Sequence, residues 1–245
     1  MKLTRPIFRL KRDARIASRT HGIPLHSALD QVAVEEGYRS WSLLAAAHDA
    51  APPEEHLYSR LSAGDLVLIG SRPGHGKTLM GMKLATQAVR AGATGMFFTL
   101  EYSAKNVAER IKQLKMPEGN ERAFHVDCSN EICAGYIAAK LQAARHGTLA
   151  VIDYLQILDQ RRETPPLDEQ VRSLKALAKR QGLILAFVSQ IDRSFDMSDR
   201  SCPDLRDVRL PNALDLCLFD HAVFLHDGQV EMHDLQGKRP SDDGA

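Results

Sequence analysis

The chain has 245 residues, of which 44% are hydrophobic and 26% are charged, as is typical of a soluble globular protein with one sizeable α/β core and a small accessory domain. Its formal net charge of +1 excludes a uniformly basic nucleic-acid-binding chain, so any basic surface must be local. Four cysteines without a C-x-x-C pair, and no apolar run near the roughly 20 residues that span a bilayer, predict a cytoplasmic protein with free thiols and no membrane contact.

The first 50 residues are predicted to form a small helical module. The stretch from Leu25 onward places Leu25, Leu29 and Val32 on one face of a helix. The paired prolines in residues 51–59 predict a linker, so a second domain is expected over residues 60–236.

In this second region apolar strands alternate with amphipathic helices. Strands are expected within residues 65–71, 94–100, 123–128, 148–158 and 183–190, and helices within 77–89, 103–115, 132–145 and 167–182. Continuous apolar strands joined by crossovers long enough for a helix predict an α/β fold with a mostly parallel sheet covered by helices on both faces. Asp227 and Gly228 between two short strands predict a C-terminal β-hairpin, and residues 237–245 indicate a polar tail.

The loop between the first strand and the first helix of this region fits a phosphate-binding pattern. The residues expected to surround the phosphates are Ser71, Arg72, Pro73, Gly74, His75, Gly76, Lys77 and Thr78. They match G-x-x-x-x-G-K-[ST] except at the first position, and the strand before and helix after are the context that such a loop requires. The glycines let backbone N–H groups turn toward phosphate oxygens, and the helix N-terminus adds a positive dipole end. The alternative, an ordinary Gly-rich turn, is disfavoured by Gly-Lys-Thr at a helix start.

Three polar side chains at later strand ends complete a candidate nucleotide site. Asp153 follows four apolar residues, and a carboxylate at the carboxyl end of a strand can hold Mg²⁺ directly or through water. Glu101 is placed to polarise an attacking water, and Gln190 to sense a γ-phosphate. Each of the three, taken alone, is also compatible with a turn-capping or solvated side chain.

Five blocks, taken in order, resemble the RecA-fold ATPase domain of DnaB-type replicative helicases. They are SRPGHGKT, TLEYSAKNVAERI, VIDYLQIL, LKALAKRQGLILAFVSQIDR and PDLRD. The Arg-Pro pair in the phosphate loop and the Asp-Tyr-Leu-Gln after the fourth strand are particular marks of that group. The resemblance covers roughly residues 60–228, and in that family a small residue other than glycine is common at the position of Ser71.

The resemblance implies ATP hydrolysis with ATP and Mg²⁺ as the bound groups. Lys77 and Thr78 would contact phosphate and Mg²⁺, and Asp153 would be the second metal-binding residue. Glu101 would be the catalytic glutamate and Gln190 the γ-phosphate sensor. The family hydrolyses nucleotide between subunits of a ring, so a homo-oligomer, with a hexameric ring as one form, is implied.

Two further features of the family concern this chain's basic residues. An arginine finger reaches across the subunit interface, and the candidates here are Lys238 and Arg239. Loops in the central channel bind single-stranded DNA, and the candidates are Arg161, Arg162, Arg193 and Arg200. Phe195 is the main aromatic residue available there for stacking on bases.

Two functions remain open at this point. The first is a DNA helicase or translocase that acts on single-stranded DNA. The second is a regulatory or assembly ATPase whose nucleotide state switches a protein partner, without helicase activity. The five helicase-like blocks favour the first function. The stretch VRLPNALDLCLFD departs from the family pattern, and the first 50 residues do not look like the family's primase-interacting domain; both favour the second function. A third possibility, nucleotide binding with slow hydrolysis, is disfavoured by the joint presence of Glu101, Asp153 and Gln190.

Overall fold

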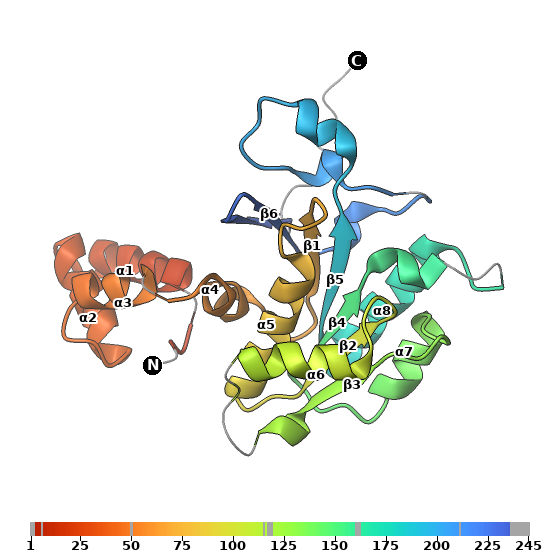
Figure 1. Cartoon of the computed structure of the whole chain (residues 1–245). Helices are drawn as coiled ribbons and strands as arrows, with labels where there is room; N and C mark the ends of the chain where they lie inside the picture. The colour runs from red at the N-terminus through yellow and green to blue at the C-terminus, as the bar shows by residue number, and fades with distance from the viewer. Residues whose placement is uncertain are drawn as a thin grey trace. The chain divides into compact units, whose positions relative to one another are not determined.

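The chain divides into two compact units, Met1–Leu61 and Ser62–Ala245 (Figure 1). The computed structural model describes residues 3–5, 7–49, 51–114, 116, 120–159, 163–210 and 212–235. No helix within these described ranges is both long enough and apolar enough to cross a membrane.

The first unit is built from helices. They are α1 (Ile7–His21), α2 (Leu25–Glu35), α3 (Trp41–Asp49) and α4 (Pro53–Arg60). Ala28 and Val32 of α2 pack in a small core with Leu10 of α1 and Leu44 of α3. The predicted apolar face is confirmed at Leu29 and Val32, which pack in or against this core, and is wrong at Leu25, the first residue of α2, which is 43% exposed.

The predicted linker of this unit is mostly helical. Residues 51–59, predicted to be a linker, contain most of α4. Pro52 is the N-cap of α4 and Pro53 its first residue, a position where the missing N–H costs no hydrogen bond.

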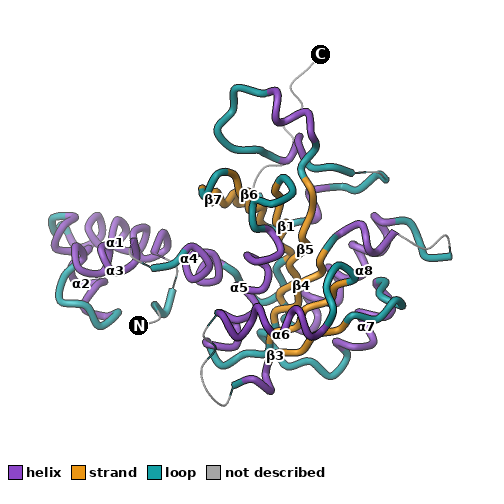
Figure 2. The backbone as a smooth tube through the Cα atoms, in the orientation of Figure 1, coloured by secondary structure: helices purple, strands orange, loops and turns teal. Residues whose placement is uncertain are grey.

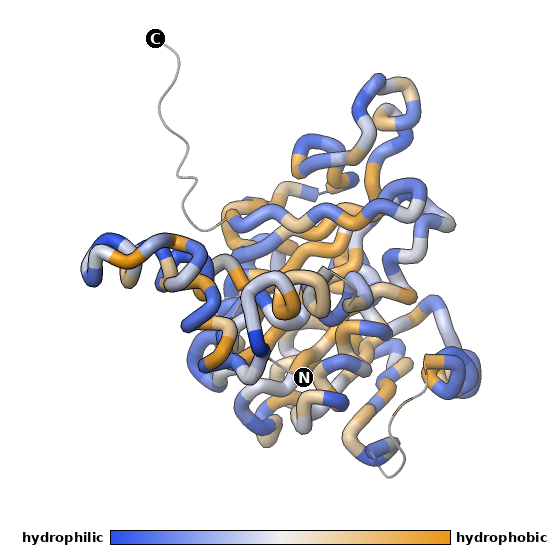
Figure 3. Tube along the Cα trace, turned by 90° about the vertical axis from the view of Figure 1, so that its left-hand side faces the viewer, coloured by the Kyte–Doolittle hydropathy of each residue, from blue (hydrophilic) through white to orange (hydrophobic). Residues whose placement is uncertain are grey.

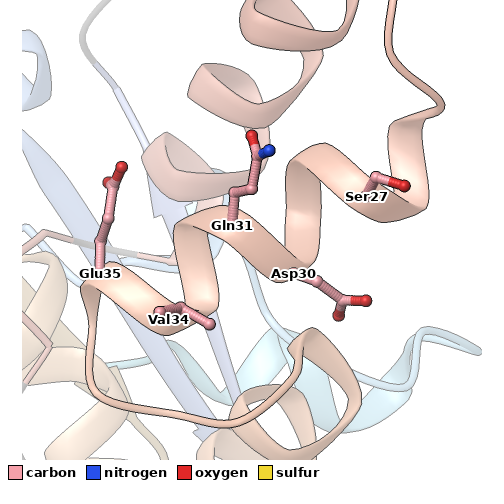
Figure 4. A pocket seen from close by; sticks show the side chains of 5 residues that line it. All are labelled: Ser27, Asp30, Gln31, Val34 and Glu35. Carbon is pink, nitrogen blue, oxygen red and sulfur yellow. The ribbon is translucent and has the colours of Figure 1, made fainter.

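One side of α2 forms a shallow pocket, lined by Ser27, Asp30, Gln31, Val34 and Glu35 (Figure 4). All five residues belong to the first unit, whereas the phosphate loop belongs to the second.

One seven-stranded sheet organises the second unit (Figure 2). Its strands are β1 (Leu66–Ser71), β2 (Gly95–Thr99), β3 (Phe124–Asp127), β4 (Leu149–Asp153), β5 (Ile184–Gln190), β6 (His221–His226) and β7 (Gln229–Asp234). The order across the sheet is β3-β2-β4-β5-β1-β6-β7, and every neighbouring pair is parallel except β6 and β7. The mostly parallel sheet and the C-terminal hairpin are therefore confirmed. At the hairpin turn both Asp227 (φ 45°) and Gly228 (φ 80°) have positive φ, as a two-residue type I′ turn requires.

Helices cover both faces of this sheet. The helices of the unit are α5 (Lys77–Arg90), α6 (Ala104–Gln113), α7 (Ala134–Leu141) and α8 (Leu167–Gln181). Short 3-10 turns lie at η1 (Glu121–Ala123), η2 (Leu155–Asp159), η3 (Arg193–Met197), η4 (Leu205–Asp207) and η5 (Leu216–Leu218). Apolar residues are concentrated along the central strands (Figure 3). The fourth predicted strand was too long, since the strand ends at Asp153 and η2 follows it.

Two glycines let α5 lie close against the sheet. A Cβ on Gly81 of α5 would lie 2.8 Å from the Val151 side chain of β4. A Cβ on Gly95 of β2 would lie 2.6 Å from the Ala85 carbonyl oxygen of α5. Because α5 begins directly after the phosphate loop, this close packing fixes where the loop lies over the sheet.

Candidate nucleotide-binding site

The phosphate loop joins the carboxyl end of β1 to the first turn of α5. Gly74 and Gly76 have φ of +87° and +88°, the left-handed conformation that side chains disfavour, while a Cβ on either would meet no atom within 4 Å. The loop therefore needs glycine for its backbone conformation and not for lack of space. Gly76 is the N-cap of α5 and Lys77 its first residue, so the first N–H groups of the helix, which have no acceptor within it, lie at the loop.

Ser71 stands where the phosphate-binding pattern has glycine. Ser71 is fully buried as the last residue of β1, and its hydroxyl donates a hydrogen bond to the Arg72 carbonyl oxygen at 2.8 Å. Ser71 is not among the described non-glycine residues with positive φ. A serine side chain is thus accommodated without backbone strain, which explains why the departure from the pattern leaves the loop intact.

A buried carboxylate lies beside the loop. Asp153 ends β4 and is fully buried. The Thr78 hydroxyl donates to its Oδ1 at 3.2 Å, and the Thr99 hydroxyl approaches its Oδ2 at 3.5 Å. Thr99 Oγ1 also accepts a hydrogen bond from the Glu101 backbone N–H at 3.1 Å. Thr99 is a site residue that the sequence reasoning missed; its position opposite Asp153 in the register of β2 and β4 follows only from the strand order.

The electrostatic environment of Asp153 is unusual. Burial, with the negative charge of Glu101, raises the pKa of Asp153 to about 7, although the Thr78 hydrogen bond, the Lys77 charge and Thr99 act to lower it. A carboxylate and a hydroxyl within hydrogen-bonding distance are the hard oxygen donors that Mg²⁺ prefers, and a dication would favour the ionised carboxylate. Thr78 and Asp153 therefore fit a magnesium ion.

The raised pKa predicts how the stability of the ligand-free protein depends on pH. An aspartate whose pKa is higher in the folded state than in the unfolded state costs stability as the pH rises from about 4 to about 7. Asp153→Asn removes this cost. In magnesium-free buffer we expect the variant to gain on the order of 2–4 kcal/mol over the wild type at about pH 8 and little at about pH 4.

Thermal or urea unfolding with a chelator present measures this difference. Asp199→Asn removes one negative charge from an exposed position and serves as the matched control. If Asp153→Asn changes the free energy of unfolding equally at both pH values, folding does not raise the pKa of Asp153.

The other predicted site residues lie at the same edge of the sheet. Gln190 ends β5 directly opposite Ser71, and the Ile191 N–H donates to the Ser71 carbonyl oxygen at 3.0 Å. Glu101 lies two residues beyond the end of β2 and is exposed. The structure thus brings together the carboxyl ends of β1, β2, β4 and β5, where ligands bind in parallel sheets.

Most of the basic residues predicted to contact DNA or a neighbouring subunit lie outside the part of the chain that the structure describes. Arg161, Arg162, Lys238 and Arg239 lie outside the described residues. Arg193 opens η3 and is exposed.

Arg200 and Phe195 are both engaged within the fold. The Arg200 guanidinium contacts Asp204 at 2.9 Å and Asp207 at 2.6 Å, and it lies 5.4 Å from the centre of the Phe195 ring. Phe195 is 2% exposed. The stacking role predicted for Phe195 is therefore wrong in this conformation, because its ring packs in the core. The two ion pairs leave Arg200 less available to a phosphate than a free arginine would be.

Comparison with known proteins identifies the family of the chain. The family model described as "DnaB-like helicase C terminal domain" matches residues 55–118 and 112–226. The replicative DNA helicase DnaB of Helicobacter pylori is 25% identical over 210 residues, which are 71% of this chain and 43% of that relative. The chain therefore spans less than half the length of this relative.

Solved structures show the same fold. A DnaB-like replicative helicase, whose structure was described with its interactions with primase, has a TM-score of 0.56 at 15% identity, covering 92% of this chain and 72% of that chain. A KaiC-like protein from Pyrococcus horikoshii has a TM-score of 0.53 at 18% identity, covering 75% of this chain and 84% of that chain. The predicted RecA-like α/β fold is confirmed by these likenesses and by the sheet order. Since the family model matches well over half of the residues, the chain belongs to the DnaB-like helicase C-terminal domain family.

Proposed function

We propose that this chain hydrolyses ATP with Mg²⁺ and that hydrolysis is coupled to the binding of single-stranded DNA, as in a helicase or translocase. The observation that carries the ATPase proposal is the contact between the Thr78 hydroxyl of the phosphate loop and the buried carboxylate of Asp153. This pair joins a phosphate cradle to a metal-binding oxygen at one sheet edge. Membership of the DnaB-like family supports the same chemistry.

In this proposal each residue has a distinct role. Lys77 contacts the β- and γ-phosphates, and the backbone N–H groups of the loop hold the remaining phosphate oxygens. Thr78 and Asp153 hold the magnesium ion, which neutralises charge on those oxygens when bound. Glu101 orients the attacking water and accepts its proton, and Gln190 contacts the γ-phosphate. Positioning and charge stabilisation supply most of the rate, because phosphoryl transfer needs little covalent participation from the protein.

The DNA part of the proposal rests on the relatives and on local charge. The curated relatives are named replicative DNA helicases. One face of α1 carries Lys11, Arg12, Arg15 and Arg19, all exposed, and Arg193 is exposed on η3. Few such contacts per subunit give weak, salt-dependent binding, so a homo-oligomeric ring is proposed to sum them. Lys238 and Arg239 remain the candidates for a residue that reaches a neighbouring subunit.

A second function has an observation in its favour. Arg200 is held by Asp204 and Asp207, and Phe195 is buried, so two of the side chains expected to contact DNA are engaged within the fold. This arrangement suits a regulatory or assembly ATPase. In such a protein the bound nucleotide would set the conformation of the loop after β5, and that loop would switch a protein partner.

One experiment distinguishes the two functions. The rate of phosphate release is measured with and without Mg²⁺ and single-stranded DNA, at low and high salt, together with the oligomer mass. We expect Mg²⁺-dependent hydrolysis that DNA stimulates at low salt, by a chain that assembles. A monomer whose rate of hydrolysis is the same with and without DNA would favour the regulatory function. No hydrolysis at all would contradict the ATPase proposal.

A further inference from the structure

The side chain of Arg72 in the phosphate loop is bound to the segment that follows β5. The Arg72 guanidinium donates from Nε to Asp196 Oδ1 and from Nη2 to Asp196 Oδ2, both at 2.8 Å. Its Nη1 donates to the Ile191 carbonyl oxygen at 3.0 Å. Three of the N–H groups of one arginine are therefore committed to the segment that follows β5.

The pair of Arg72 and Asp196 fixes the orientation of the two segments more than it stabilises the fold. The hydrogen bonds from Arg72 lower the pKa of Asp196, so the carboxylate stays ionised near neutral pH. The Arg72 side chain is 15% exposed, but that of Asp196 is 51% exposed, and an ion pair so open to water contributes little free energy of folding. A bidentate arginine–carboxylate pair does fix the relative direction of its two groups.

A second contact ties the same two segments together. The His75 ring of the phosphate loop stacks on the His226 ring, with centroids 4.9 Å apart and planes 5° from parallel. The His226 ring in turn meets the edge of the Phe195 ring of η3 at 5.1 Å. The Asp227 N–H donates to His75 Nδ1 at 3.2 Å.

The histidine stack is a packing contact. Possible ligand atoms of His75, His226 and Asp227 lie within 4.8 Å of one another, as in a metal site. The lone pairs of imidazole nitrogens lie in the ring plane, however, and two nearly parallel planes do not meet at a common metal position. The stack instead holds η3 against the phosphate loop from a second side.

We propose that Arg72 is a positioning residue for the γ-phosphate sensor: it locks the segment from Ile191 to Asp196 to the phosphate loop and so sets where Gln190 lies. The Ile191 carbonyl that Arg72 holds belongs to the residue next to Gln190, and Gln190 pairs with Ser71 across the sheet. A shift of the loop on nucleotide binding is passed through Arg72 to Gln190 and to η3. This inference rests on the proposed ATP hydrolysis.

A double-mutant cycle tests the lock. Arg72→Ala and Asp196→Asn are each expected to lower kcat for ATP hydrolysis about 10- to 100-fold and to leave KM within about twofold. Because both changes break the same pair, the double variant should be no slower than the slower single variant. Arg72→Lys keeps the charge but cannot bond in bidentate fashion, so it should behave like Arg72→Ala.

The controls separate this inference from folding and from the proposed function. Arg206→Ala removes an exposed arginine that pairs with Asp204, and it should keep the wild-type kcat. Thermal unfolding and the affinity for a fluorescent ATP analogue should match wild type in every variant. If the wild type hydrolyses ATP and the two single effects multiply, or Arg72→Lys restores kcat, the positioning role is wrong while the ATPase remains. A wild type without ATPase activity overturns the proposed function, and this inference with it.

Discussion

Replacing Lys77 by alanine is expected to lower the rate of ATP hydrolysis about a hundred- to a thousandfold. Lys77 is the first residue of α5, directly after the left-handed Gly76, and the proposed function places its ammonium group against the phosphates. Its positive charge also helps to keep the pKa of Asp153 from rising further. On the proposed function, the variant loses a counter-charge for the γ-phosphate and also lowers the ionised fraction of Asp153, the proposed magnesium ligand.

The measurement is steady-state phosphate release at saturating Mg²⁺ and ATP. Lys112→Ala, which removes an exposed lysine from the end of α6, is the matched control and should keep the wild-type rate. Equal melting temperatures would show that the Lys77 variant is folded. A Lys77→Ala protein that hydrolyses ATP at the wild-type rate would mean that the loop at residues 71–78 does not bind the reacting phosphates.

Glu101→Gln should separate binding from hydrolysis. An amide cannot take a proton from water, so turnover is expected to fall about 10²- to 10⁴-fold. Nucleotide affinity should persist, since Glu101 is exposed beyond β2 and the phosphate loop is untouched. The negative charge of Glu101 raises the pKa of Asp153, so the neutral variant should have a more fully ionised Asp153 and bind Mg²⁺ at least as well.

Single-turnover hydrolysis and equilibrium binding of an ATP analogue provide the two readings. Glu109→Gln changes an exposed glutamate of α6 and should affect neither. Undiminished turnover in Glu101→Gln would remove Glu101 from the catalytic role. A joint loss of affinity and turnover would place it in nucleotide binding instead.

The sheet and its phosphate loop could be predicted from the sequence for a physical reason. A parallel strand buried on both faces has apolar side chains on both, so β1, β4 and β5 appear as uninterrupted apolar runs. Asp153 ends the run of β4, and Lys77 follows the short loop after β1, which puts both at the carboxyl edge of the sheet in any α/β arrangement. The order of the strands, and hence the pairing of Thr99 with Asp153, needed the structure.

Features that depend on partners distant in the sequence could not be predicted. Nothing local to Arg72 points to Asp196, which lies 124 residues away, and local composition made Arg200 look available for DNA. The Phe195 ring packs against His226 of β6, which follows later in the chain. Pro52 and Pro53 mark a chain break by composition, but their missing N–H groups are equally suited to the start of a helix.

The antiparallel strand β7 has a consequence for assembly. Within the described residues it is the outermost strand beside β6, and its exposed positions carry Gln229, Glu231, His233 and Asp234. Charged side chains along an edge strand oppose continuous pairing with the edge of another sheet, which is also the route to aggregation. The β7 edge therefore disfavours a shared sheet between two copies, so the proposed ring would have to form through side-chain surfaces.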